Sequence, residues 1–241
     1  MSKPVTPRRT VVESLVTQPR TRPEPAWPSD GVIFDANCTL CPRLARFLAQ
    51  GLEEYPHYYS RPVPPFGDPK AHLIIVGLAP GFHGANATGR AFTGDYAGLL
   101  LYRTLHQFGF ANRPESISSE DGLRLIDCRI NNPVKCVPPE NKPTPEEVRT
   151  CSRYLAADLA TIPPRSVLLA LGLIGHGTLL RTLGLRVADY PFGHGAEHAL
   201  PNGHTLLDSY HCSRYNTQTR RLTDEMFADV FRRARELIDG R

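Results

Sequence analysis

Four cysteines stand in a pattern that is typical of metal binding. Cys38 and Cys41 form a C-x2-C pair, and Cys136 and Cys151 follow with fourteen residues between them. Four thiolates hold either a tetrahedral zinc ion or a [4Fe–4S] cluster. The alternative interpretation is that Cys136 and Cys151 are ordinary buried thiols. Six cysteines in a chain without an export signal favour reduced thiols or a metal site over disulfides.

Three polar stretches carry the other side chains suited to chemistry. The first, 77–95, reads GLAPGFHGANATGRAFTGD and has five glycines, so a ligand can approach its backbone closely. The other two are NNPVKC, 131–136, and HCSRYNTQTRRLT, 211–223. A phosphate cradle is one interpretation of the glycine-rich stretch. Its position 79, where a carboxylate would be useful, is alanine.

Short apolar runs precede these stretches and predict the strands of a sheet. They cover 72–77, 123–130, 166–172 and 204–211. Near-continuous apolar runs are typical of parallel strands covered on both faces. Helical patterns alternate with them at 97–110, 144–162, 174–184 and 222–238, and 185–203 is expected to be a loop or a small hairpin. The alternation predicts an α/β/α sandwich with right-handed crossovers.

Two local patterns sharpen this prediction. Thr144, Pro145 and Glu147 form a capping box with proline at the first helical position, which places a helix start there. Ligands of such sheets bind beyond the carboxyl ends of the strands. The three polar stretches follow the first, second and fourth apolar runs, so we expect their side chains to meet at one edge of the sheet.

The overall composition sets the class of protein. The chain has 241 residues, 23 prolines and a formal net charge of +4, which fits one domain, 31–241, behind a flexible, basic, proline-rich arm, 1–30. The arm is either a disordered leader or an aid to polyanion binding. Because the sequence shows neither a secretory signal nor an apolar run of ~20 residues, we expect a cytoplasmic, nucleoid-associated monomer that avoids membranes.

Taken together, the motifs resemble those of one family. GLAPG followed by TGRAFTGD, then NNPVKC, PPENKPTPEEVRTC and HCSRYNTQTRRLT occur in the order found in the uracil-DNA glycosylase superfamily. Within it, the chain is similar to the iron–sulfur family 5, the B type. The resemblance runs from about Cys38 to Thr223. It implies a three-layer α/β/α sandwich with a central four-stranded parallel sheet, in agreement with the four apolar runs.

The resemblance also implies a structural [4Fe–4S] cluster on Cys38, Cys41, Cys136 and Cys151. Two departures from the superfamily pattern are visible. The last motif usually begins His-Pro-Ser, whereas here Cys212 stands in place of the proline and permits a looser turn. Most of the superfamily has a polar or acidic residue at position 79. Family 5 typically lacks it, which agrees with Ala79.

Roles for the base-binding side chains follow from the same resemblance. Cleavage of an N-glycosidic bond in duplex DNA requires the nucleotide to leave the stack. Phe92 is the expected stacking surface for the base. Asn132, whose amide both donates and accepts, is expected to read its edge, with Asn131 as the competing candidate. Gly77, Ala79 and His83 are expected beside the base.

His211 is the expected catalytic residue. A hydrogen bond to O2 of the departing uracil would stabilise the growing negative charge, and a preorganised donor of this kind contributes ~3–4 kcal/mol. Asn132 and Asn86 complete the predicted catalytic set. With alanine at position 79, the candidates for positioning the attacking water are Asn86, Asp95 and the backbone carbonyls of 79–81. We expect a largely dissociative path that needs little general-base help.

The last polar stretch is expected to contact DNA phosphates and to fill the space left by the base. Its DNA-binding candidates are Ser213, Arg214, Asn216, Arg220 and Arg221. The leading functional hypothesis is a monofunctional glycosylase that removes uracil, and other deaminated bases such as hypoxanthine, with no lyase step. The alternatives are a non-catalytic sensor of damaged or abasic DNA and a zinc-stabilised nucleotide-binding protein.

Overall fold

A computed structural model describes residues 34–240, so the predicted arm 1–30 lies outside the described residues. One sheet organises this part of the chain, with strand order β1-β3-β2-β4-β6-β5. Its four central strands are parallel, as predicted: β3 (Cys128–Asn131), β2 (Leu73–Val76), β4 (Val167–Leu171) and β6 (Thr205–Ser209). Short antiparallel strands, β1 (Phe66–Gly67) and β5 (Glu197–Ala199), extend it at the two edges.

Burial of both faces explains why the central strands are apolar throughout. Along β2, Leu73 and Ile75 enter one hydrophobic cluster, and Ile74 and Val76 enter another on the opposite side. All four side chains are fully buried. The register places Ile75 opposite Leu169 of β4, so apolar side chains meet in rows across the sheet.

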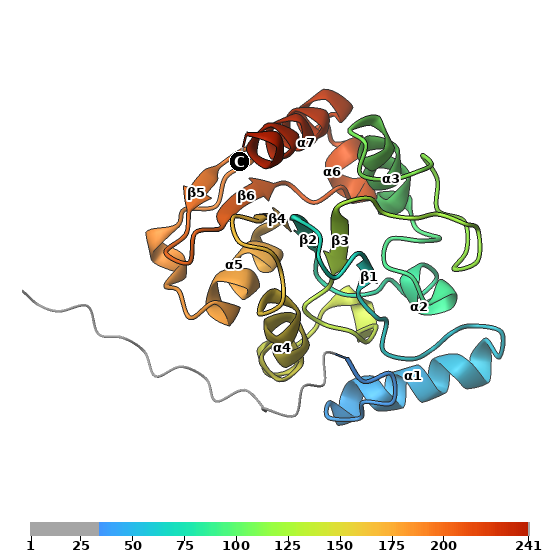
Figure 1. Ribbon diagram of the computed structural model, residues 1–241. Helices are drawn as coiled ribbons and strands as arrows, with labels where there is room; N and C mark the ends of the chain where they lie inside the picture. Colours follow the sequence, from blue (N-terminus) through green and yellow to red (C-terminus); the bar gives the residue numbers. More distant parts are fainter. Residues whose placement is uncertain (1–33, 241) are drawn as a thin grey trace, which may run out of the picture.

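Two helices cover each face of the sheet (Figure 1). On one face, α3 (Tyr96–Gln107) and α7 (Asp224–Asp239) contribute Leu101, Leu105, Phe227 and Phe231 to the first cluster. On the other, α4 (Pro145–Leu159) and α5 (Leu173–Thr182) contribute Leu155, Leu159, Leu179 and Leu180 to the second. The three-layer α/β/α arrangement predicted from the sequence is therefore confirmed. No helix in residues 34–240 combines the length and apolarity needed to cross a membrane.

Three helices were not anticipated from the sequence. α1 (Pro42–Glu54) begins directly after Cys41 and packs Leu44 and Leu48 on Val134 and Val137 in a third, smaller cluster. α2 (Ala85–Thr88) lies inside the glycine-rich stretch, and α6 (Arg214–Gln218) lies inside the last polar stretch. Two 3-10 turns, Pro139–Asn141 and Val187–Asp189, complete the helical elements.

The predicted strand 123–130 is wrong in its first half. Asp127 has a left-handed backbone with φ of 48°, which breaks an extended strand, and β3 begins only at the next residue. The Asp127 carboxylate accepts hydrogen bonds from the backbone and ring of His72, and Leu125 forms an isolated antiparallel bridge with Ala111. The segment 185–203, predicted to be a loop or small hairpin, does pair back on β6 through β5.

The predicted capping box is confirmed. The Thr144 hydroxyl accepts from the backbone N–H of Glu147 at 3.2 Å, and the Glu147 carboxylate accepts from the Thr144 N–H at 2.8 Å. Glu147 also pairs with Arg43 of α1 at 2.7 Å. The start of α4 therefore holds α1, the helix that follows the C-x2-C pair, in place.

Candidate active site

The parallel register brings four strand ends to one edge of the sheet. β2 is followed by Gly77, β3 by Asn132, β4 by Gly172 and β6 by Tyr210 and His211. A Cβ atom built on Gly77 would lie 2.5 Å from Asn132 Oδ1 and 3.0 Å from Cζ of Phe92. A Cβ on Gly172 would lie 3.4 Å from that of His211. Glycine is therefore required at the end of β2, where these groups converge.

Phe92 and His211 face one another at this edge. Their ring centroids are 6.0 Å apart and the ring planes are inclined by 30°. Phe92 is 6% exposed, and its backbone is left-handed, with φ of 56°. The backbone carbonyl of His211 accepts a hydrogen bond from Asn216 Nδ2 at 2.8 Å, so the short helix α6 fixes the loop that carries the histidine.

Asn132 has an unpaired amide oxygen. The residue is 6% exposed, and its Oδ1 is buried without a hydrogen-bond partner. A buried acceptor left unpaired costs about 1–3 kcal/mol, so its partner is expected to come from outside the protein. Because this oxygen lies beside Gly77 and the Phe92 ring, a donor on a planar ligand held against Phe92 would satisfy it.

We call the place where Gly77, Phe92, Asn132 and His211 converge the pocket. Asn131 does not enter it. Its Nδ2 donates to Asp158 at 2.7 Å, and its Oδ1 accepts from Lys135. Asp158 also forms a buried ion pair with Arg129 at 2.8 Å. Both ends of the Asn131 amide are occupied in this network, so of the two neighbouring asparagines only Asn132 has an atom free for a ligand.

His211 is neutral at physiological pH. Burial of the ring lowers its pKa to about 4. No charged partner offsets this effect in the described residues, since desolvation is its sole cause. A neutral imidazole still carries one N–H, so His211 can donate a hydrogen bond without bringing a charge to the pocket.

The candidates for positioning a water lie in different surroundings. Asn86 is fully buried, with Nδ2 directed at Phe82 O, 3.4 Å, and its Oδ1 unpaired. Asp95 caps α3 by accepting from Gly98 N at 3.0 Å. Its Oδ2 would lie 3.7 Å from a Cβ on Gly81. Burial raises the pKa of Asp95. Ala79 packs against the third hydrophobic cluster, as Phe47 and Phe82 do.

His83 lies apart from the pocket in the structure. It is exposed, and its Nδ1 is 2.8 Å from the hydroxyl of Tyr58. Its ring packs edge-on against Tyr55 and Phe82 at the end of α1. The structure therefore places His83 in a separate aromatic group rather than beside Phe92 and His211.

The last polar stretch presents cationic side chains near the pocket. Ser213 caps α6 by accepting from Asn216 N. The Arg214 guanidinium lies over the Tyr96 ring, and that of Arg221 lies over the Tyr210 ring at 4.7 Å. Arg220 is exposed and has a left-handed backbone, with φ of 58°. The structure thus brings the five predicted DNA-binding residues together on one short helix and the turn that follows it.

All four cysteines of the predicted cluster line one pocket. Cys38, Cys41, Cys136 and Cys151 surround it together with apolar Leu40, Leu44 and Pro62, and none of them forms a disulfide. Burial, followed by repulsion from the other three thiolates, raises the pKa of Cys136. The backbone N–H of Lys135 donates to Cys151 Sγ at 3.2 Å. Within residues 34–240, no three His, Cys, Asp or Glu side chains stand at the spacing needed for one metal ion.

Sequence reasoning missed the residues that hold Phe92 in place. Gly98, in the first turn of α3, lies so close that a Cβ there would collide with the Phe92 carbonyl. The Tyr102 hydroxyl donates to Ala91 O at 2.6 Å. No motif signals these contacts, although a glycine one turn after a helix cap, where it lowers helix stability, is a weak hint.

The comparisons with known proteins agree with this geometry. Residues 64–235 match the family model of the uracil DNA glycosylase superfamily. The chain belongs to this superfamily. A type-5 uracil-DNA glycosylase of Thermus thermophilus is 48% identical over 205 residues, which cover 83% of this chain and 93% of the relative. A type-5 enzyme of Pyrobaculum aerophilum is 42% identical over 86% of this chain and 92% of its own length.

Weaker similarities extend to a further relative and to a solved structure. A type-4 uracil-DNA glycosylase of Pyrobaculum aerophilum is 38% identical over 130 residues, or 54% of this chain and 58% of the relative. Among solved structures, SMUG2 of Pedobacter heparinus matches with a TM-score of 0.47 and 14% identity, covering 81% of this chain and 85% of that one. The resemblance found in the sequence motifs is confirmed at the level of the superfamily.

Gly77→Ala should weaken ligand binding in the pocket. The added methyl would crowd Asn132 Oδ1 at 2.5 Å and the Phe92 ring at 3.0 Å, so both groups must move. We expect base release to fall by up to about 100-fold, the cost of a 1 Å misplacement, while the melting temperature changes little. The control needs a glycine with an ordinary backbone conformation, which excludes Gly203, where φ is positive. Gly177→Ala, where only the end of the Arg181 side chain is near, is the matched control and should retain activity. Full activity of Gly77→Ala would contradict this geometry.

The lowered pKa of His211 predicts a dependence of stability on pH. Because the folded pKa, about 4, lies below the unfolded value near 6.5, the unfolded chain binds the proton more readily between these values. The contribution of the neutral His211 to the free energy of unfolding is fully present above pH 6.5 and is lost as the pH falls toward 4. The free energies of unfolding of wild type and His211→Asn, measured in urea, should therefore converge or cross as the pH falls. Parallel curves over this range would show that the histidine is not buried in this way.

Proposed function

We propose that the chain is a uracil-DNA glycosylase that hydrolyses the N-glycosidic bond of deoxyuridine in DNA and leaves an abasic site. The observation that carries the proposal is the unpaired Oδ1 of Asn132, buried beside the Phe92 ring in a pocket that His211 also borders. Membership of the superfamily and identities of 42–48% to type-5 enzymes over most of the chain support the same activity.

Recognition of uracil follows from the chemistry of its edge. Uracil carries an N3–H donor next to the O4 acceptor, so the amide of Asn132 can accept from the first and donate to the second. Cytosine lacks the N3–H and would leave Oδ1 unpaired. Such a site rejects a ligand that cannot complete its hydrogen bonds. To reach Asn132 and stack on Phe92, the base must be turned out of the duplex.

His211 then stabilises the leaving base. As the glycosidic bond breaks, negative charge grows on the uracil O2, and a neutral imidazole N–H held at the end of β6 can donate to it. The surroundings that lower the pKa of His211 also strengthen such a hydrogen bond, because water competes less. The sugar is left with oxocarbenium character, and water captures it.

For the water, we favour Asp95 over Asn86. Asp95 Oδ2 lies beside Gly81 and Gly84 of the glycine-rich stretch, whereas Asn86 is fully buried, directs its Nδ2 at Phe82 O and offers only its unpaired Oδ1. Burial raises the pKa of Asp95, so its carboxylate is a stronger proton acceptor than a solvated one. None of the side chains placed in the pocket is a lysine, so we expect no Schiff base and no strand cleavage.

Other deaminated bases are expected as further substrates. Alanine at position 79, in the loop after β2, is smaller than the polar or acidic residue that most of the superfamily has there, and we take this difference as the feature that would admit a purine. Hypoxanthine carries an N1–H beside O6 and presents the same donor and acceptor order to Asn132 as uracil does.

A [4Fe–4S] cluster fits the four-cysteine pocket. The donor set is four thiols that converge without a disulfide in a largely apolar pocket, and the Lys135 N–H already donates to one of the sulfurs. We propose that Cys38, Cys41, Cys136 and Cys151 hold it, and that it supplies cross-links between α1, α4 and the segment after β3.

Activity is tested with oligonucleotides that carry uracil, hypoxanthine or xanthine opposite each base and in single strands. Wild type should release free base under single-turnover conditions, and His211→Ala should be slower by a factor of ~100–1000, as for removal of one preorganised donor. Asp95→Asn should be slower than Asn86→Ala. Tight binding to abasic DNA without release of any free base would indicate a sensor and overturn the proposal.

The cluster is tested on protein purified without oxygen. We expect a broad visible absorbance and about four irons and four sulfides per chain. Cys136→Ser and Cys151→Ser should lose both. Cys128→Ser is the matched control, because Cys128 is equally buried but belongs to the sheet core rather than the pocket. Stoichiometric zinc without iron would show that the pocket holds a different group.

A further inference from the structure

The stacking residue is held in a strained conformation. Phe92 has φ of 56°, a region that a bulky L-residue rarely adopts. Such a backbone persists only where the surrounding structure determines it. On one side, the Phe92 carbonyl rests on Gly98 of α3, and the Tyr102 hydroxyl holds the carbonyl of Ala91 at 2.6 Å. These contacts fix the backbone on one side of Phe92.

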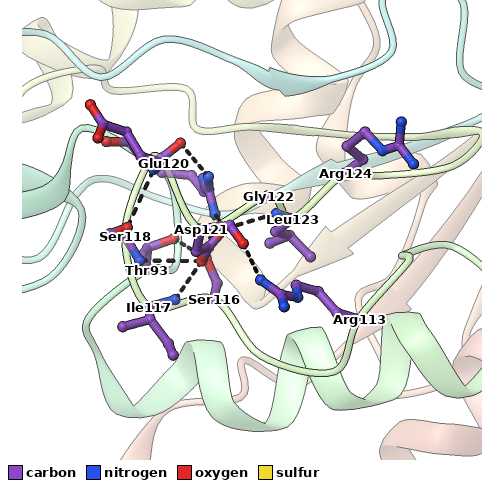
Figure 2. A network of polar contacts seen from close by, with 12 residues as sticks. Thr93, Arg113, Ser116, Ile117, Ser118, Glu120, Asp121, Gly122, Leu123 and Arg124 are labelled. Atoms are coloured by element: carbon purple, nitrogen blue, oxygen red, sulfur yellow. Dashed lines mark hydrogen bonds and ion pairs between the residues drawn. The ribbon is translucent and has the colours of Figure 1, made fainter.

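The other side of Phe92 is fixed by a segment that sequence reasoning did not single out. Residues 113–124 run between α3 and β3, and Figure 2 shows their polar contacts around Asp121. The Thr93 hydroxyl lies 2.6 Å from that of Ser116. Thr93 follows Phe92 directly, so the segment contacts the side chain of the residue next to the strained one.

Arg90 anchors the segment from two residues before Phe92. Its guanidinium donates to Asp121 Oδ1 at 2.8 Å, to Ser116 Oγ at 3.0 Å and to Ser119 O at 2.6 Å. It also lies over the Phe66 ring at 4.7 Å. The side chains of Arg90 and Asp121 are only 6% and 8% exposed. Four partners and burial leave this arginine no freedom to contact DNA.

Asp121 in turn shapes the segment that receives Arg90. Its Oδ2 accepts from the backbone N–H of Ile117 at 2.7 Å, and its Oδ1 accepts from that of Leu123 at 2.8 Å. One carboxylate therefore closes the turn and pairs with the arginine at the same time. Both charged groups therefore have hydrogen-bond partners within the protein, which a buried ion pair needs to offset its loss of hydration.

We propose that the Arg90–Asp121 pair is a positioning element of the active site. The pair holds Phe92 in its left-handed conformation and so keeps its ring opposite His211. The proposal rests on the proposed function, because it takes Phe92 as the stacking surface. Arg90 acts through Phe92 and touches neither substrate nor reacting atoms. Loss of the pair lets the backbone relax to negative φ, and the ring then leaves its place opposite His211.

A double-mutant cycle separates this role from general stabilisation. Single-turnover base release is measured for wild type, Arg90→Gln, Phe92→Ala and the double variant. Arg90→Gln should slow the wild-type enzyme by about tenfold, within the range of a ring misplaced by up to 1 Å. In the Phe92→Ala background it should have less than about a twofold effect, because there is no ring left to position. Arg90→Lys, which keeps the positive charge but lacks the forked guanidinium group, should give an intermediate rate of base release.

Arg235→Gln is the matched control. Arg235 also lies over an aromatic ring, Phe110 at 3.7 Å, and donates to a backbone carbonyl, Phe108 O at 3.0 Å, but it belongs to α7. It should lower the melting temperature without changing the rate in either background. If Arg90→Gln does not fold, Ser116→Ala, which deletes one hydroxyl, replaces it in the same cycle.

The outcomes distinguish this inference from the proposed function. An equal loss from Arg90→Gln in both backgrounds overturns the positioning role alone. Unchanged rates for Phe92→Ala overturn the stacking assignment and this inference together, while His211→Ala still tests the glycosylase activity itself. Gly98→Ala gives an independent check: it should slow base release as Arg90→Gln does, since its methyl displaces the Phe92 carbonyl, and a fully active Gly98→Ala also counts against the proposal.

Discussion

The close approach at the end of β2 is the constraint on which the site depends. Gly77 leaves room for the Asn132 amide and the Phe92 ring on one side. On the other side Gly175 of α5 packs on the carbonyls of Val76 and Gly77, where a Cβ would lie 2.8–2.9 Å away. Gly77 and Gly175 thus let the Asn132 amide, the Phe92 ring and α5 all approach the backbone at the end of β2. Phe92 and Asn132 meet at that contact, and the helices on both faces of the sheet support the strands that carry it.

Much of the scaffold could be predicted because its signals are local. Runs such as Leu73–Val76 are apolar throughout since both faces of the sheet are covered, and Thr144 with Glu147 marks a helix start by chemistry that needs no tertiary contact. The helix α1 was not among the predicted helices, and its contacts are with segments distant in sequence: the loop after β2, the segment after β3 and the start of α4. The strand prediction was wrong for 123–127 because the left-handed backbone of Asp127 interrupts the extended chain, and the hydropathy of the neighbouring residues does not signal this.

The site was predictable in its parts but not in its geometry. Family motifs pointed to Phe92, Asn132 and His211, and the structure brings these three together. They could not show that Asn131 is engaged by Asp158, or that His83 stands with Tyr58, because those contacts join segments far apart in the sequence. The left-handed backbone of Phe92 is likewise imposed from outside, by α3 and by the segment 113–124.

The two neighbouring asparagines at the end of β3 also limit how this part of the chain can change in length. Because side chains alternate along a strand, Asn131 enters the charged network with Asp158 and Asn132 enters the pocket. A substitution such as Ile130→Val costs only about 0.5–1.5 kcal/mol. Insertion of one residue in β3 would instead place Ile130 opposite Asp158, and deletion of one residue would place Pro133 at the position of Asn132. Either change removes one of the two amides from its place, so β3 tolerates substitutions better than a change in length.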